Sequence, residues 1–156
     1  MKAILLIDHG SRRREANDML HCMANLVQAM AGPGVIVRAA HMELAEPTIE
    51  QGFADCVEAG ATEVVAFPYM LSPGRHSIED IPRMVAATAA THRGVVFNVT
   101  PAFGVHEKLA DLILSRAGID RHASAAHDFD CCWSPDKAEI SCGDACRVKQ
   151  MSAVGA

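Results

Sequence analysis

The sequence predicts a doubly wound α/β fold in which helices cover both faces of a parallel four-stranded sheet. Short, almost continuously apolar runs alternate four times with segments of helical periodicity. The apolar runs lack the polar–apolar alternation of a sheet with one solvated face, so the strands should be buried on both sides. Polar residues and glycines follow each run, where ligands bind in sheets of this class.

In the first half of the chain, glycine and proline mark the ends of the elements. Apolar residues recur at three- and four-residue intervals through the first helical segment, which Gly32 ends. Pro47 suits the first turn of the second helical segment, and Gly60 suits its C-terminal cap. The expected elements are a strand over residues 2–8, a helix over 13–30, a strand over 35–40 and a helix between 47 and 60.

The second half repeats this alternation twice and then loses it. Pro82 falls in the first turns of the third helical segment, where a missing N–H is tolerated. The expected elements are a strand over residues 63–67, a loop over 68–77, a helix over 78–90, a strand over 94–99 and a helix over 105–116. From Gly118 onward no long periodic stretch remains. We therefore expect one domain over residues 1–117 and an irregular, cysteine-rich extension over 118–156.

Composition excludes several classes of protein. The chain of 156 residues has 14 basic and 19 acidic residues, a net charge of −5, which argues against nucleic-acid binding. Aromatic residues make up only 4%, too few for base-stacking platforms. No apolar run approaches the roughly 18 residues of a membrane span, and the apolar start is too short for a signal peptide. We expect a cytoplasmic protein.

Four of the six cysteines lie in the last 26 residues, at positions 131, 132, 142 and 146. In a cytoplasmic protein such crowding favours a metal site over disulfide bonds. The other two, Cys22 and Cys56, fall within helical segments and are expected to be small core residues.

Histidines and a glutamate follow the predicted strands. The carboxyl ends of parallel strands meet at one edge of a sheet, so these side chains should gather there. Imidazole binds divalent first-row metal ions and accepts protons near neutral pH. The residues concerned are His9, His41, Glu43, His76 and, with less support, His106.

Arginines flank the same edge. Arg12, Arg13 and Arg14 lie at the start of the first helix, where cations oppose the helix dipole, and Arg75 precedes His76. An anionic ligand would explain this placement; three solvated arginines are the alternative.

Three segments carry a resemblance to a known family. Residues 6–12 (LIDHGSR), 42–47 (MELAEP) and 68–82 (PYMLSPGRHSIEDIP) resemble the small CbiX-type sirohydrochlorin chelatases, which are class II chelatases. The likeness covers about residues 2–117, with the segments in the same order and at matching spacing. It implies a chelatase-like fold and a lyase that inserts Co²⁺, Fe²⁺ or Ni²⁺ into sirohydrochlorin without ATP, in siroheme or cobalamin biosynthesis. It also implies a homodimer.

The resemblance assigns roles to individual residues. His9 and His76 match metal-binding, catalytic histidines, and Glu43 matches a glutamate that accepts protons or assists as a ligand. Ser11, Arg12, Arg13 and Arg75 would bind the substrate, since arginine suits a macrocycle rich in carboxylates. His41 stands where an apolar residue is expected in relatives, and we interpret it as a bystander.

Some relatives, notably in plants, hold an iron–sulfur centre on C-terminal cysteines. Four cysteines satisfy the ligand count for such a cluster, although the spacing here matches no common ferredoxin pattern. We expect a cluster on Cys131, Cys132, Cys142 and Cys146, with structural zinc or no ordered metal as alternatives.

Two other functions compete with insertion of a metal. A non-catalytic metal or tetrapyrrole carrier could use His9 and His76 to bind without turnover. A histidine phosphatase would need an arginine where Asp8 stands, and an acid there repels phosphate.

Overall fold

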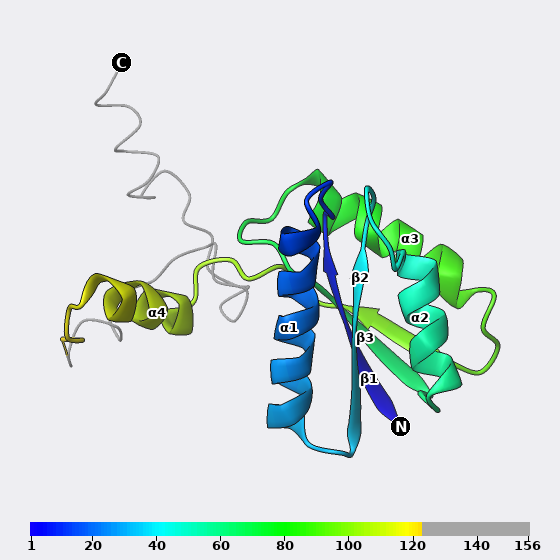
Figure 1. Cartoon of the computed structure of the whole chain (residues 1–156). Helices are drawn as coiled ribbons and strands as arrows, with labels where there is room; N and C mark the ends of the chain where they lie inside the picture. Colours follow the sequence, from blue (N-terminus) through cyan, green and yellow to red (C-terminus); the bar gives the residue numbers. More distant parts are fainter. Residues whose placement is uncertain (123–156) are drawn as a thin grey trace, which may run out of the picture. The chain divides into compact units, whose positions relative to one another are not determined.

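The computed structural model describes residues 1–122, and Figure 1 shows its elements. Contacts divide the chain into one unit over Met1–Ala102 and a second that begins at Phe103. The expected boundary between residues 117 and 118 stays a prediction. The cysteines expected to hold a cluster, Cys131, Cys132, Cys142 and Cys146, lie outside the described residues.

The first unit contains the predicted parallel four-stranded sheet. Its strands are β1 (Lys2–Asp8), β2 (Val35–His41), β3 (Glu63–Pro68) and β4 (Val96–Val99), in the spatial order β2-β1-β3-β4. β1 lies between β2 and β3 and pairs in parallel with both. Its last residue, Asp8, pairs with His41 at the end of β2. The two strands therefore stop at the same level, and their following loops start side by side.

Helices cover both faces of this sheet, so the doubly wound arrangement is confirmed. The expectation that every strand is buried on both sides was wrong for β4, an edge strand with mostly exposed side chains. α1 (Arg14–Ala31) lies on one face, and α2 (Ile49–Glu58) and α3 (Ile81–Ala89) lie on the other (Figure 1). Alternate strand residues therefore enter two separate apolar clusters. Leu6 and Val37 pack with Leu20 of α1, while Leu5 and Ile36 belong to the cluster that holds Phe53 of α2.

Local sequence explains how α2 begins and how closely it packs. Thr48 caps the helix through a capping box, in which its hydroxyl and the Gln51 side chain each accept a bond from the other residue's backbone N–H. Gly52 faces the sheet, and a Cβ atom there would lie 2.9 Å from both Ala40 Cβ and Leu5 Cδ1. The absence of a side chain allows the helix to approach the sheet this closely.

The segment before α3 differs from the expected single helix over residues 78–90. Residues His76–Asp80 form a π-helical turn in which Ile81 N–H donates to the His76 carbonyl oxygen, five residues back. Pro82 supplies no backbone N–H for the turn that precedes it. Such turns are frequent at functional sites.

α4 (Glu107–Ala117) belongs to the second unit. His106 Nδ1 accepts a bond from the Lys108 N–H at its start, and Gly118 ends it in the left-handed conformation. Arg121 forms ion pairs with Glu107 and Asp111 on this helix.

The two cysteines of the first unit differ in environment. Cys56 is fully buried, as expected, and burial raises the pKa of its thiol to about 12. Cys22 is exposed, so its assignment to the core was wrong. Within residues 1–122, no helix is long and apolar enough to cross a membrane.

Candidate functional site

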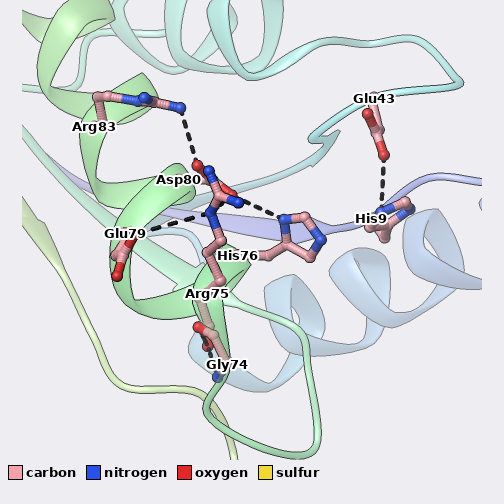
Figure 2. A network of polar contacts seen from close by, with 9 residues as sticks. His9, Glu43, Gly74, Arg75, His76, Glu79, Asp80 and Arg83 are labelled. Carbon is pink, nitrogen blue, oxygen red and sulfur yellow. Dashed lines mark hydrogen bonds and ion pairs between the residues drawn. The ribbon is translucent and has the colours of Figure 1, made fainter.

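His9 and Glu43 face each other on the loops that follow β1 and β2. The His9 Nε2 atom lies 2.8 Å from Glu43 Oε1 (Figure 2). Both side chains are about half exposed, 44% and 52%, so solutes can reach them from solvent. The pair combines an imidazole and a carboxylate, two groups that bind divalent ions and take up protons.

Backbone contacts fix the spacing of these two loops. Glu43 N–H donates to the His9 carbonyl oxygen at 3.2 Å, which continues the contacts between β1 and β2 beyond the strands. Gly10 has φ +82°, and a Cβ atom there would lie 1.9 Å from the Glu43 carbonyl oxygen. Only glycine fits this close approach. The loop that carries His9 therefore lies directly against the loop that carries Glu43.

His76 enters the same region from the π-helical turn. Its ring lies edge-on to the His9 ring, with the two centroids 5.2 Å apart. The turn is anchored by Ser77, whose hydroxyl accepts from the Gly74 N–H at 2.9 Å and donates to the Gly74 carbonyl oxygen at 3.1 Å. Side chains from two loops and the π-helical turn, those of His9, Glu43 and His76, thus lie at the carboxyl edge of the sheet, as expected from where the parallel strands end.

Asp80 controls the orientation of His76. Its Oδ2 atom lies 3.0 Å from His76 Nδ1, one helical turn away, and its Oδ1 atom accepts from Arg83 at 2.9 Å (Figure 2). A carboxylate only accepts hydrogen bonds, so Nδ1 carries the proton. The lone pair of the neutral ring is then on Nε2. Carboxylates hold metal-binding histidines in proteins in this way.

The three side chains do not yet form a closed coordination shell. Among residues 1–122, no three histidine, cysteine, aspartate or glutamate groups are arranged closely enough to hold an ion as they stand. His9 Nε2 is occupied by its bond to Glu43. Ion binding would break that bond, because Nε2 can contact a metal only when the ring carries its proton on Nδ1 and the Nε2 lone pair is free.

The arginines that were expected to bind an anion are exposed. Arg75 is 77% exposed and lies 3.9 Å from a carboxylate oxygen of Glu79 and of Asp80, distances at which such pairs are weak. Arg12 and Arg13 are exposed at the start of α1, with Arg13 at the capping position. Ser11 Oγ accepts from the Arg13 N–H at 3.0 Å and so shapes this turn.

Two other histidines expected near this edge have different surroundings. His41 is fully buried at the end of β2, with Nδ1 2.6 Å from Asp8 Oδ1. His106 belongs to the second unit and caps α4, so its expected participation stays a prediction.

Sequence reasoning missed Asp80 and Asp8. The four-residue spacing from His76 to Asp80 was the available signal for the first contact. Alternation along paired strands was the signal for the contact of Asp8 with His41.

Comparison with known proteins gives a consistent family. The family model CbiX matches residues 3–119. The chain is 43% identical over 113 residues to the chloroplastic sirohydrochlorin ferrochelatase of Arabidopsis thaliana, covering 72% of this chain and 50% of that protein. It is 34% identical to a sirohydrochlorin cobaltochelatase of Methanococcoides burtonii, covering 73% of this chain and 92% of that protein.

A solved structure of a sirohydrochlorin chelatase is also similar to this chain. The sirohydrochlorin chelatase SirB from Bacillus subtilis subspecies spizizenii, in complex with cobalt, superposes with a TM-score of 0.68 at 30% identity, covering 75% of this chain and 50% of that one. The chain thus spans about half the length of several curated relatives that it matches.

The contact between Asp80 and His76 predicts a tautomer. Asp80→Ala should move the neutral His76 ring from the Nδ1–H form toward the Nε2–H form, because Nδ1–H loses its acceptor. Two-bond ¹H–¹⁵N correlation spectra of the imidazole distinguish the forms. Asp80→Asn is the matched control, since its amide oxygen can still accept. An unchanged Nδ1–H ring in Asp80→Ala would show that the carboxylate does not set the tautomer.

Proposed function

This chain belongs to the CbiX family, and we propose that it is a sirohydrochlorin chelatase that inserts Fe²⁺ or Co²⁺ into its substrate. The observation that carries the proposal is the meeting of His9, Glu43 and His76 at the exposed carboxyl edge of the sheet. Relatives named as ferrochelatases and cobaltochelatases support the same substrate and reaction. Use of Ni²⁺ and independence from ATP are part of the proposal and come from the family resemblance.

The reaction replaces two pyrrole protons of the macrocycle by one divalent ion. The protein must therefore remove water from the ion and accept two protons. His76, with Nε2 unprotonated, is suited to displace a water molecule from the arriving ion. The His9 imidazole and the Glu43 carboxylate would accept the two pyrrole protons and pass them to solvent, since both side chains are about half exposed.

The arginines would contribute to binding of the macrocycle. Sirohydrochlorin carries many carboxylates, and the exposed arginines Arg12, Arg13 and Arg75 lie close in sequence to His9 or His76. Ser11 holds the turn that presents Arg12 and Arg13. Contacts made by exposed charges are screened by salt, so this contribution to binding should decrease as ionic strength rises.

Activity assays test the reaction directly. His9→Ala and His76→Ala should each lower the rate of anaerobic Fe²⁺ and Co²⁺ insertion by about 100-fold or more, since each removes a group that binds the metal or moves protons. Formation of the metallated product is followed by absorption spectra. His21→Ala on α1 is the matched control and should keep its activity.

Two results would contradict this function. One is near-normal turnover in both variants. The other is stoichiometric binding of metal or macrocycle with no product above the uncatalysed rate, which would favour the carrier.

We propose a homodimer as the active form. One copy of the unit supplies one sheet edge, whereas a broad macrocycle has two faces to be enclosed. A two-fold pair would supply the second wall. Light scattering at micromolar concentration should give the mass of two chains, and a monomer would contradict the proposal.

The tail is proposed to bind an iron–sulfur cluster. The support is the crowding of Cys131, Cys132, Cys142 and Cys146 in a segment without hydrophobic periodicity, where a metal would supply ordering free energy. Protein purified without oxygen should contain iron and sulfide. Replacing the four cysteines by serine should remove both and leave insertion intact, because His9, Glu43 and His76 belong to the first unit. Colourless protein without sulfide would contradict the cluster, and loss of insertion would contradict its dispensability.

A further inference from the structure

His41 is an unexpected residue in the interior of the first unit. It ends β2 with no exposed surface, and strand alternation places it on the α1 face, where its ring packs edge-on against His21 with centroids 5.7 Å apart. Within residues 1–122, its Nε2 atom is a buried side-chain nitrogen without a hydrogen-bond partner. An apolar side chain would occupy this place without leaving a polar atom unsatisfied, so packing alone does not explain a histidine here.

The bond that His41 makes is to the residue before His9. His41 Nδ1 lies 2.6 Å from Asp8 Oδ1, and that same oxygen accepts from the Gly10 N–H at 2.9 Å. One carboxylate oxygen therefore holds both the end of β2 and the residue that follows His9. The Asp8 carbonyl oxygen accepts from the Met42 N–H at 2.8 Å, which fixes the two chains together at the next position.

These contacts are made by residues that are neighbours in sequence of His9 and Glu43. His9 lies between Asp8 and Gly10, and the Gly10 N–H donates to the Asp8 carboxylate. Glu43 lies two residues beyond His41, which contacts the same carboxylate oxygen. Removing the side chain of His41 would free the Asp8 carboxylate to rotate and would loosen its bond to Gly10. The 2.8 Å contact between His9 Nε2 and Glu43 Oε1 would then be held less firmly in place.

We propose that the buried Asp8–His41 pair is a positioning device that holds His9 and Glu43 at the spacing needed to receive the metal ion. His41 acts through Asp8 and touches neither the metal nor the macrocycle. The proposal rests on the proposed function for the identity of the ion. It replaces the interpretation of His41 as a bystander.

The test compares His41→Leu with His41→Asn in the full-length protein. Leucine fills the buried space without a donor, whereas the asparagine amide can place an N–H near the position of Nδ1. Calorimetric titration with cobalt(II) chloride, without macrocycle, measures ion binding. The His9→Ala variant defines the part of that binding that depends on the site, so binding by the tail cysteines is subtracted.

We expect His41→Leu to weaken His9-dependent Co²⁺ binding by about 10- to 100-fold, the usual effect of losing such supporting contacts. His41→Asn should restore most of it. Thermal melting should show His41→Leu still folded at the temperature of the titration, because removing the unsatisfied Nε2 atom offsets part of the cost of leaving the partly exposed Asp8 carboxylate without its partner. In insertion assays, kcat should fall while KM for sirohydrochlorin stays unchanged. A merely structural role would instead lower binding only in proportion to the fraction of unfolded protein. His21→Leu, which removes the ring contact and keeps the Asp8 bond, should bind Co²⁺ as the wild type does.

Unchanged Co²⁺ affinity in His41→Leu would overturn the proposal, as would a loss that only follows a lower melting temperature. If His41→Leu does not fold, Asp8→Ala tests the same pair: weaker binding supports the proposal and unchanged binding overturns it. Wild-type protein that binds Co²⁺ through His9 and yields no metallated product would contradict the proposed function alone. Absence of His9-dependent binding in the wild type would overturn both.

Discussion

The parallel pairing of β1 with β2 is the constraint on which the site depends. Asp8 and His41 form the last pair of residues in that register, so the two loops leave the sheet at the same level. Gly10 then allows the first loop to lie against the second, with backbone atoms closer than a side chain would permit. A shift of one residue in this register would turn Asp8 and His41 to different faces and would separate His9 from Glu43. The chemistry of the edge therefore follows from a backbone arrangement.

Hydrophobic periodicity was enough to predict the four strands, four helices and the common edge. It predicted less well where one element changes into another. Residues 78–90 have an unbroken helical pattern, yet the structure places a π-helical turn over His76–Asp80 before α3. Hydrophobic periodicity cannot distinguish an α-helical turn from a π-helical turn, because the two differ only by one residue in the spacing of their backbone hydrogen bonds. Cys22 was misplaced for a related reason: its neighbours carry the apolar stripe, and a single cysteine fits either face of α1.

The candidate site was predictable in its residue types and less so in its supports. That His9, Glu43 and His76 meet follows from where the strands end. Spacing along the helix and pairing of the strands place Asp80 and Asp8 within reach of the histidines, but side-chain rotamers decide whether the 3.0 Å and 2.6 Å contacts form. His41 shows the limit most clearly, because a histidine after a strand is usually solvated. Its burial arises from the packing of α1 over the end of β2.

His9 and Glu43 share one backbone ladder, whereas His76 stands on a separately anchored turn. An ion at this edge would thus be bound by two side chains that share one backbone support and by a third side chain on a separate support. A cage closed by equally rigid ligands would hold its ion with a long residence time. Ligands on separate supports could release the ion one at a time, which would shorten that time. Under the proposed function, in which each ion passes on to a macrocycle, release in separate steps would be an advantage.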